Sequence, residues 1–165
     1  MPYNLLKVYN IKLELDGLSV SERIESLKRI FNRDFVEDNL FFRGIPVYPT
    51  PNEGIDTMAV LFDHLTRKRN NDGSREYDRE RSARLHWVRH HITERIPSKI
   101  CVFSTLDKEG IRTYIHDKSE SYVIILEPRT KLDFKHYYLL TAYYSTGRDV
   151  IKLKKKEKRK LSDIH

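Results

Sequence analysis

Four short stretches decide the fold: KICVFST (residues 99–105), IRTYIH (111–116), YVIILE (122–127) and YYLLTAYYS (137–145). Each is rich in the β-branched and aromatic residues that favour strands. Tight polar turns, at 107–110 and 117–120, separate the first three. Because links this short join antiparallel neighbours, we expect a meander of four antiparallel strands.

Helical patterns dominate the sequence before these strands. Ser19 and Glu22 have the spacing of a capping box, and apolar residues recur at helical intervals over 20–32 and 55–68. A long helix is predicted over 75–95 and is ended by Pro97. Helices followed by a run of strands predict an α+β fold, in which the helices pack on one face of a four-stranded antiparallel sheet.

The first fifty residues are predicted to be an extension of this domain. Apolar and polar residues alternate over 5–15, which indicates a strand, and 35–43 is a second strand candidate. Three prolines, Pro46, Pro49 and Pro51, argue against regular structure after that. We therefore expect a strand-helix-strand extension (1–52) docked on the main domain (53–147), followed by a basic tail (148–165).

Composition excludes several classes of protein. The chain has 165 residues, 39% of them hydrophobic, and a single cysteine, Cys101. One cysteine forms no internal disulfide, and the apolar content exceeds that of disordered chains. No apolar run approaches the roughly 20 residues that cross a bilayer. Residues 1–4 do not resemble a signal peptide, so a cytoplasmic protein is expected.

Most of the positive charge lies near the end of the sequence. The formal net charge is +7, and residues 148–160 hold eight basic and two acidic residues, so this segment carries +6. A basic segment beside a nearly neutral body indicates a polyanionic partner. The alternative is a solvated terminus with no binding role.

The predicted helix over 75–95 is unusually rich in histidine. Its apolar stripe contains Leu85, Val88 and Ile92, whereas His86 and His90 lie on another side. Their i, i+4 spacing suits a metal pair, but no third ligand or HExxH pattern accompanies it. They are otherwise surface residues without a role, or catalytic or phosphate-binding groups.

The predicted sheet offers partners for these histidines. Since side chains alternate along a strand, Arg112, Tyr114 and His116 share one face, and Thr141 and Tyr143 lie together on the last strand. Such a face provides a fixed cation and hydroxyl donors. The same residues are also ordinary on a solvated sheet face.

Four strings, taken in order, resemble a known group. They are RLHWV (84–88), RTYI (112–115), YVIILE (122–127) and YYLLTAYY (137–144). They are similar to the phage- and prophage-associated branch of the barnase–EndoU–colicin–RelE-like nuclease superfamily, over roughly residues 78–145. The link at 128–135 is longer than is usual in that branch.

This resemblance implies a metal-independent endoribonuclease, without a cofactor, in which the 2′-hydroxyl of RNA attacks the adjacent phosphate. It assigns acid–base catalysis to His86, phosphate binding to Arg112, and hydrogen-bond donation to Thr141 and Tyr143. Six further residues are expected to contact the nucleic acid: Trp87, His90, Tyr114, Lys154, Lys155 and Lys156. The expected partners are RNA and, for a toxin, a cognate inhibitor protein, with no membrane.

Two other functions remain open: a non-catalytic RNA- or DNA-binding module on the same scaffold, and an interaction protein that docks through its N-terminal segment. The nuclease hypothesis makes one spatial demand. His86 and Arg112 must face a common cleft.

Overall fold

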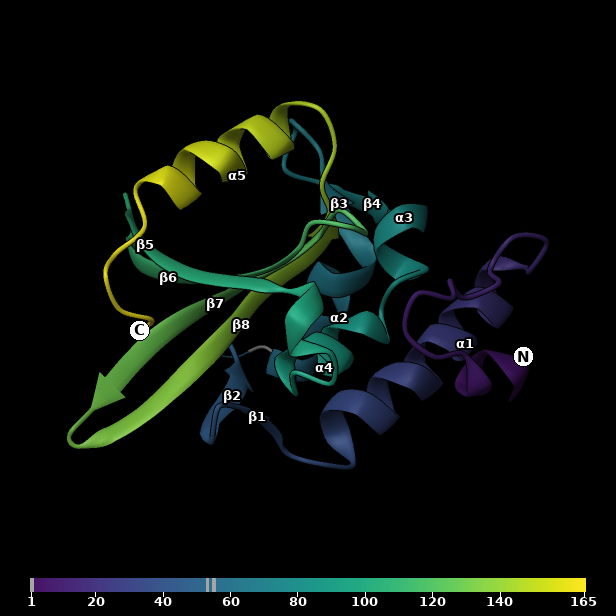
Figure 1. The fold of residues 1–165 in the computed structure, drawn as a ribbon. Coiled ribbons are helices and arrows are strands. Elements are labelled where there is room, and N and C mark those ends of the chain that lie inside the picture. Colours follow the sequence, from purple (N-terminus) through teal and green to yellow (C-terminus); the bar gives the residue numbers. More distant parts are fainter. Residues whose placement is uncertain (1, 53, 55) are drawn as a thin grey trace.

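A computed structural model describes residues 2–52, 54 and 56–165 and has an α+β fold (Figure 1). The strands are β1 (Leu40–Phe42), β2 (Ile45–Pro49), β3 (Arg67–Arg69), β4 (Arg75–Tyr77), β5 (Cys101–Asp107), β6 (Gly110–Asp117), β7 (Tyr122–Lys131) and β8 (Phe134–Tyr144). The α-helices are α1 (Val20–Phe31), α2 (Thr57–Thr66), α3 (Arg79–Ser82), α4 (Trp87–Ile92) and α5 (Arg148–Lys158). Shorter helical turns are η1 (Pro2–Leu6), η2 (Asn32–Val36) and η3 (Pro97–Lys99).

The predicted meander is confirmed. Strands β5 to β8 pair in sequence order, each antiparallel to the next. The first turn is closed by Gly110, whose φ of +120° is a backbone conformation that few other residues adopt. The β7–β8 hairpin continues through the predicted link at 128–135 and reaches Lys131 and Phe134.

The prediction of a four-stranded sheet is wrong, because the sheet has six strands in the order β1-β2-β8-β7-β6-β5. Strand β2 pairs parallel to β8, with Val47 opposite Tyr137, and antiparallel to β1. Pro46 and Pro49 do not prevent this, since they lie near the ends of a short strand, where few ladder bonds are lost. The sheet therefore includes residues 40–49 of the expected extension.

The long helix predicted over 75–95 is also wrong. Residues 75–77 form β4, which pairs with β3 in a separate two-stranded hairpin. The Asn70–Ser74 turn closes this hairpin, and Asp78 then caps the short helix α3. Between α3 and α4 the chain forms tight turns with i, i+3 hydrogen bonds, such as that from the Trp87 N–H to the Arg84 carbonyl, so the helix is not continuous. Local turn chemistry here prevails over a helical apolar pattern.

The N-terminal alternation over 5–15 does not form a strand. After η1 the chain runs irregularly to the capped start of α1 and docks on the body through Leu13 and Leu15, both buried. The Leu13 N–H donates to the Ala83 carbonyl. The strand predicted over 35–43 is reduced to Leu40–Phe42, because η2 continues the preceding helix to Val36.

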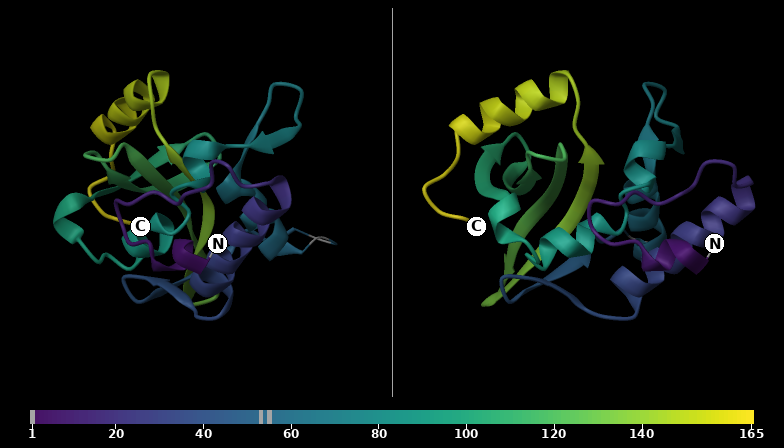
Figure 2. Two further views of the ribbon diagram at one scale, coloured as in Figure 1. Left: turned by 90° about the vertical axis from the view of Figure 1, so that its right-hand side faces the viewer. Right: turned by 45° about the vertical axis from the view of Figure 1, so that its right-hand side comes forward.

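The sheet has two different faces, visible in the two views of Figure 2. One, the helix face, packs against α1, α2 and α4 through the main core, which includes Leu27, Leu65, Trp87 and Ile124. The other, the α5 face, carries a small cluster of Phe103, Tyr114, Val123 and Leu153. The expected basic tail is thus largely a helix that lies on the sheet.

Residues after α5 wrap around the edge strand β5. The Leu161 N–H donates to the Ser104 carbonyl, and the main chain of His165 bonds with the Ser104, Thr113 and Tyr137 hydroxyls. In the described part of the chain, no helix combines the length and apolarity that a membrane span requires.

Candidate functional site on the open end of the α5 face

His86 and Trp87 lie in the core of the protein. The His86 side chain is 5% exposed, and its Nε2 lies 2.8 Å from the Ile11 carbonyl oxygen and 3.2 Å from that of Val8. Burial lowers the pKa of His86, although the two carbonyl contacts oppose this. Trp87 is 1% exposed and packs edge-on against Tyr9 and Tyr122. Both residues hold the N-terminal loop in place, and Trp87 offers no face to a base.

The neighbouring histidines belong to the same buried cluster. His90 stacks on Tyr9 with ring centroids 4.5 Å apart, and burial, followed by the nearby His91 and Arg95, lowers its pKa to about 4. His91 Nε2 lies 3.0 Å from the fully buried Asp117 carboxylate, which also accepts hydrogen bonds from Tyr9 and Ser119. Burial opposes the ionisation of Asp117, but these donors together hold its pKa below the usual range.

The structure does not bring His86 and Arg112 together. His86 packs with the core of the helix face, whereas Arg112 projects from the α5 face, where its Nη1 lies 3.0 Å from Glu127 Oε2. The β-sheet lies between them. The demand that the two side chains share a cleft is therefore not met.

The remaining predicted residues of the sheet share the face of Arg112 but make other contacts. The Tyr114 hydroxyl donates to Asp107 at 2.7 Å and its ring stacks on Phe103, so it is buried beneath α5. Lys156 Nζ lies 2.7 Å from the same Asp107 carboxylate. Thr141 accepts a hydrogen bond from Arg81, and burial raises the pKa of Tyr143 to about 12.

Lys154 and Lys155, which are expected to contact nucleic acid, lie on the solvent side of α5. Both are exposed on α5, and neither forms an ion pair within the described ranges 2–52, 54 and 56–165. Leu153, between them and the sheet, is buried and fixes the orientation of the helix. The lysine face therefore points away from the sheet and is available to a polyanion.

A cluster that the sequence did not single out surrounds Arg112. Glu127 on β7 lies between Arg112 and Arg129 and forms an ion pair with each, the contact with Arg129 being very close. Glu127 and Arg112 are largely buried, while the Arg129 side chain is 56% exposed. We call these three residues the arginine–glutamate cluster. It holds a carboxylate and two fixed guanidinium groups at the rim of the sheet.

Strand β8 places an imidazole and a phenol beside this cluster. In the β7–β8 ladder Tyr138 lies opposite Glu127, and His136 lies opposite Arg129. His136 is thus the diagonal neighbour of Glu127, at a typical separation of about 7–8 Å. His136 is 8% exposed, and its buried Nδ1 has no bonding partner among the described residues, as is also true of His86 Nδ1. A hollow of about 350 Å³ borders Arg129 and His136, but it is lined mainly by residues of the helix face, such as Pro128 and Tyr137, and includes neither Glu127 nor Arg112.

The arrangement is suited to proton transfer next to a bound anion. A carboxylate accepts a proton, an imidazole donates one, and planar guanidinium groups hold phosphate oxygens in pairs. Among the described residues, no group of three or more histidine, cysteine, aspartate or glutamate side chains is arranged to hold a metal ion.

One signal in the sequence could have found this cluster. Glu127 and Arg129 lie two residues apart on one strand, so they share a face of the sheet. Arg112 lies on the preceding strand of the predicted meander and can therefore be their neighbour.

Comparisons with protein-family models, with curated proteins and with solved structures find no match to this chain. The case for function therefore rests on the geometry of the site.

Proposed function

We propose that the protein is a metal-independent endoribonuclease whose site is the arginine–glutamate cluster with His136. The observation that carries this proposal is Glu127 held between Arg112 and Arg129, with His136 opposite Arg129. The sequence resemblance to a ribonuclease superfamily points to the same reaction class, but the site that it implied, His86 with Arg112, is not formed, so this proposal moves the acid role to His136.

The reaction assigns one role to each side chain. Glu127 accepts the proton of the 2′-hydroxyl as its oxygen forms a bond to phosphorus, and His136, in its protonated form, gives a proton to the departing 5′-oxygen. Arg112 and Arg129 stabilise the charge that develops on the phosphate. The products are a 2′,3′-cyclic phosphate and a 5′-hydroxyl. Glu127 and His136 are diagonal neighbours on paired strands.

This proposal is tested with end-labelled RNA in excess chelator between pH 5 and 8. Cleavage with a 2′,3′-cyclic phosphate end is expected, with a bell-shaped pH dependence, because one group must be ionised and the other protonated. His136→Ala should abolish cleavage, and an RNA with a 2′-O-methyl group at each position should stay intact. If the RNA stays intact throughout this pH range, the protein is not a ribonuclease.

The second candidate is a non-catalytic RNA-binding module. The exposed lysines of α5 favour it, since Lys154 and Lys155 are cations that can contact phosphates without any contribution from Glu127 or His136. In that case affinity for RNA survives in His136→Ala and Glu127→Gln, and no product appears in either the variants or the unmodified protein.

A further inference from the structure

Two rows of side chains run next to each other on the open end of the α5 face. Strand β7 contributes Arg129 and Lys131, and strand β8 contributes His136 and Phe134 directly opposite them. Tyr138 continues the aromatic row, and Tyr48 of β2 lies beside it. A cationic row thus borders an aromatic row, where the β7–β8 hairpin extends away from α5 (Figure 1).

The rings of this surface are exposed to an unusual degree. Tyr48 is 43% exposed, Phe134 is 51% exposed, and Phe41 of β1, which faces the same side by strand alternation, is 46% exposed. Among the described residues only one other large aromatic side chain, Tyr3, is similarly exposed. Clustered exposed apolar surface of this kind marks a binding site.

The rings are also held in fixed positions. The Phe134 ring lies nearly parallel to His136, with centroids 5.7 Å apart, and Tyr138 meets His136 edge-on at 4.9 Å. Tyr48 contacts the same imidazole at 5.9 Å. We call Phe41, Tyr48, Phe134 and Tyr138 the aromatic platform. Its side chains are attached to paired strands, so little conformational entropy is lost when a flat ligand stacks on them.

We propose that the aromatic platform stacks unpaired bases and that the substrate of the neighbouring site is single-stranded RNA, an inference that rests on the proposed function. Bases of single strands are free to stack on aromatic side chains, whereas those of a duplex are enclosed. Phosphates of the bound strand follow Arg129 and Lys131.

Charge selects RNA over an apolar protein partner. Arg129 is exposed, and Lys131 forms no ion pair in the part of the chain that the structure describes. Residues on one face of a strand repeat at about 6.8 Å. Each cation of β7 lies opposite a ring of β8, and these pairs repeat along the strands. This arrangement suits a nucleic-acid strand, in which each phosphate is accompanied by a base.

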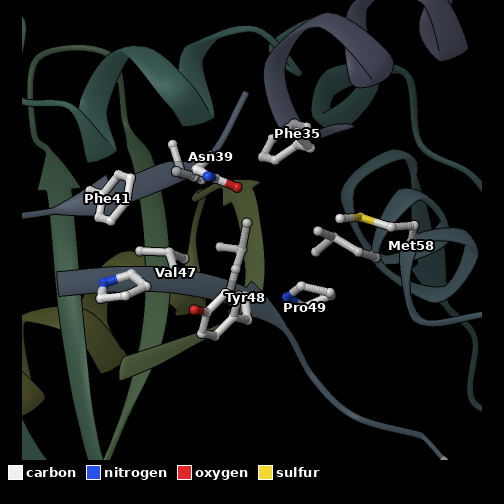
Figure 3. Close-up of a pocket in the computed structure, with 11 residues that line it drawn as sticks. Phe35, Asn39, Phe41, Val47, Tyr48, Pro49 and Met58 are labelled. Carbon is white, nitrogen blue, oxygen red and sulfur yellow. The ribbon is translucent and has the colours of Figure 1, made fainter. Parts of the chain in front are cut away.

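The apolar surface continues past Tyr48 into a hollow of about 140 Å³ (Figure 3). Phe41, Asn39 and Tyr48 stand around it, with Met58 and Phe35 from the helical side. The Asn39 amide and the Tyr48 hydroxyl are polar groups at this opening, and they supply hydrogen-bond donors and acceptors for a base edge. The platform therefore extends from β8 across β2 to β1.

The test uses strands that cannot be cleaved, so that binding is measured apart from catalysis. The probes are a fluorescent 2′-O-methyl octanucleotide, an abasic strand of the same length, and a duplex. Tyr48→Leu and Phe134→Leu should each weaken binding of the octanucleotide by about five-fold or more, as the loss of one stacked base predicts. Binding of the abasic strand should not change in these variants.

Tyr3→Leu is the matched control, because it removes an exposed ring outside the platform. Its affinity for the octanucleotide should equal that of the unmodified protein. Equal affinity in the platform variants, tighter binding of the duplex, or no binding of any strand would overturn the platform. Tight, ring-dependent binding of RNA that is never cleaved would instead overturn the proposed catalysis and leave the platform intact.

Discussion

The N-terminal cluster and the open end of the α5 face contain the same kinds of side chain, histidine, tyrosine and charged groups, in different surroundings. In the first, His86 contacts the carbonyls of Val8 and Ile11, and His91 is paired with the buried Asp117. In the second, Glu127 and His136 are also buried, at 7% and 8% exposed, but Arg129 is half exposed and the rings of Tyr48 and Phe134 face solvent. Residue type and burial of the histidine therefore do not distinguish the two regions. The exposed cation and rings beside the histidine do.

The largest expected effect separates the two regions by catalysis. Glu127→Gln should lower the rate of RNA cleavage by about 10²- to 10⁴-fold, because the amide accepts no proton from the 2′-hydroxyl. Single-turnover cleavage of labelled RNA measures this. The matched variant is His86→Gln, whose amide still donates to a carbonyl of the N-terminal loop, and it should cleave at nearly the normal rate. If His86→Gln lost cleavage and Glu127→Gln kept it, the catalytic site would lie at His86 and not at Glu127.

A second contrast concerns stability. Trp87→Ala should lower the free energy of unfolding by about 3–5 kcal/mol, because it leaves a cavity in the core. Phe134→Ala should change it by only about 0.5 kcal/mol, since half of that ring is already in water. Urea denaturation followed by circular dichroism measures both. Similar losses in the two variants would show that the platform is a structural surface.

Acidification should weaken the N-terminal cluster. The pKa of His90 is about 4 in the folded protein and ordinarily 6.5, so the unfolded chain binds more protons between these values. Stability is therefore complete above pH 6.5 and falls as the pH decreases toward 4. For His90 alone the loss is roughly 1–3 kcal/mol, after allowance for its partial exposure.

His90→Phe keeps the stacking on Tyr9 and removes the titrating group. Its unfolding free energy should depend less steeply on pH between 4 and 6.5 than that of the unmodified protein, as measured by urea denaturation at each pH. An unchanged slope would mean that His90 titrates normally in the folded state.

The smallest expected effect belongs to α5. Lys154→Gln and Lys155→Gln should each reduce the affinity for single-stranded RNA a few-fold, and should lower the slope of log affinity against log salt by about 0.7. Lys156→Gln is the informative comparison, because this lysine is paired with Asp107 and should contribute less. Equal salt slopes in all three variants and the unmodified protein would assign α5 a purely structural role.

The sequence predicted those parts of the fold that depend on local chemistry. The β5–β8 meander follows from strand propensity and short turns, and the start of α1 follows from the Ser19–Glu22 capping box. It did not predict that β2 joins β8, because this pairing connects residues about ninety positions apart. Nor did it reveal the burial of His86, which depends on a loop from the other end of the chain.

The candidate site was predictable in part. Strand alternation placed Arg112 correctly on one face of the sheet, but its partners Glu127 and Arg129 were regarded only as members of a string and a link. His136 follows the link at 128–135 and precedes the string at 137–144, so it lies outside the four strings that carry the resemblance. Two oppositely charged residues at i, i+2 on a predicted strand, such as Glu127 and Arg129, are the sequence signal that best indicates this cluster.

NMR mapping of the bound RNA tests most directly whether the strand lies on the open end of the α5 face. Amide resonances of the ¹⁵N-labelled protein are followed as the uncleavable 2′-O-methyl octanucleotide is added. We expect the shifts to concentrate at Tyr48, Arg112 and residues 127–138, and residues 86–91 to remain unperturbed. Shifts confined to residues 7–11 and 86–91, with none along the β7–β8 hairpin, would contradict this expectation.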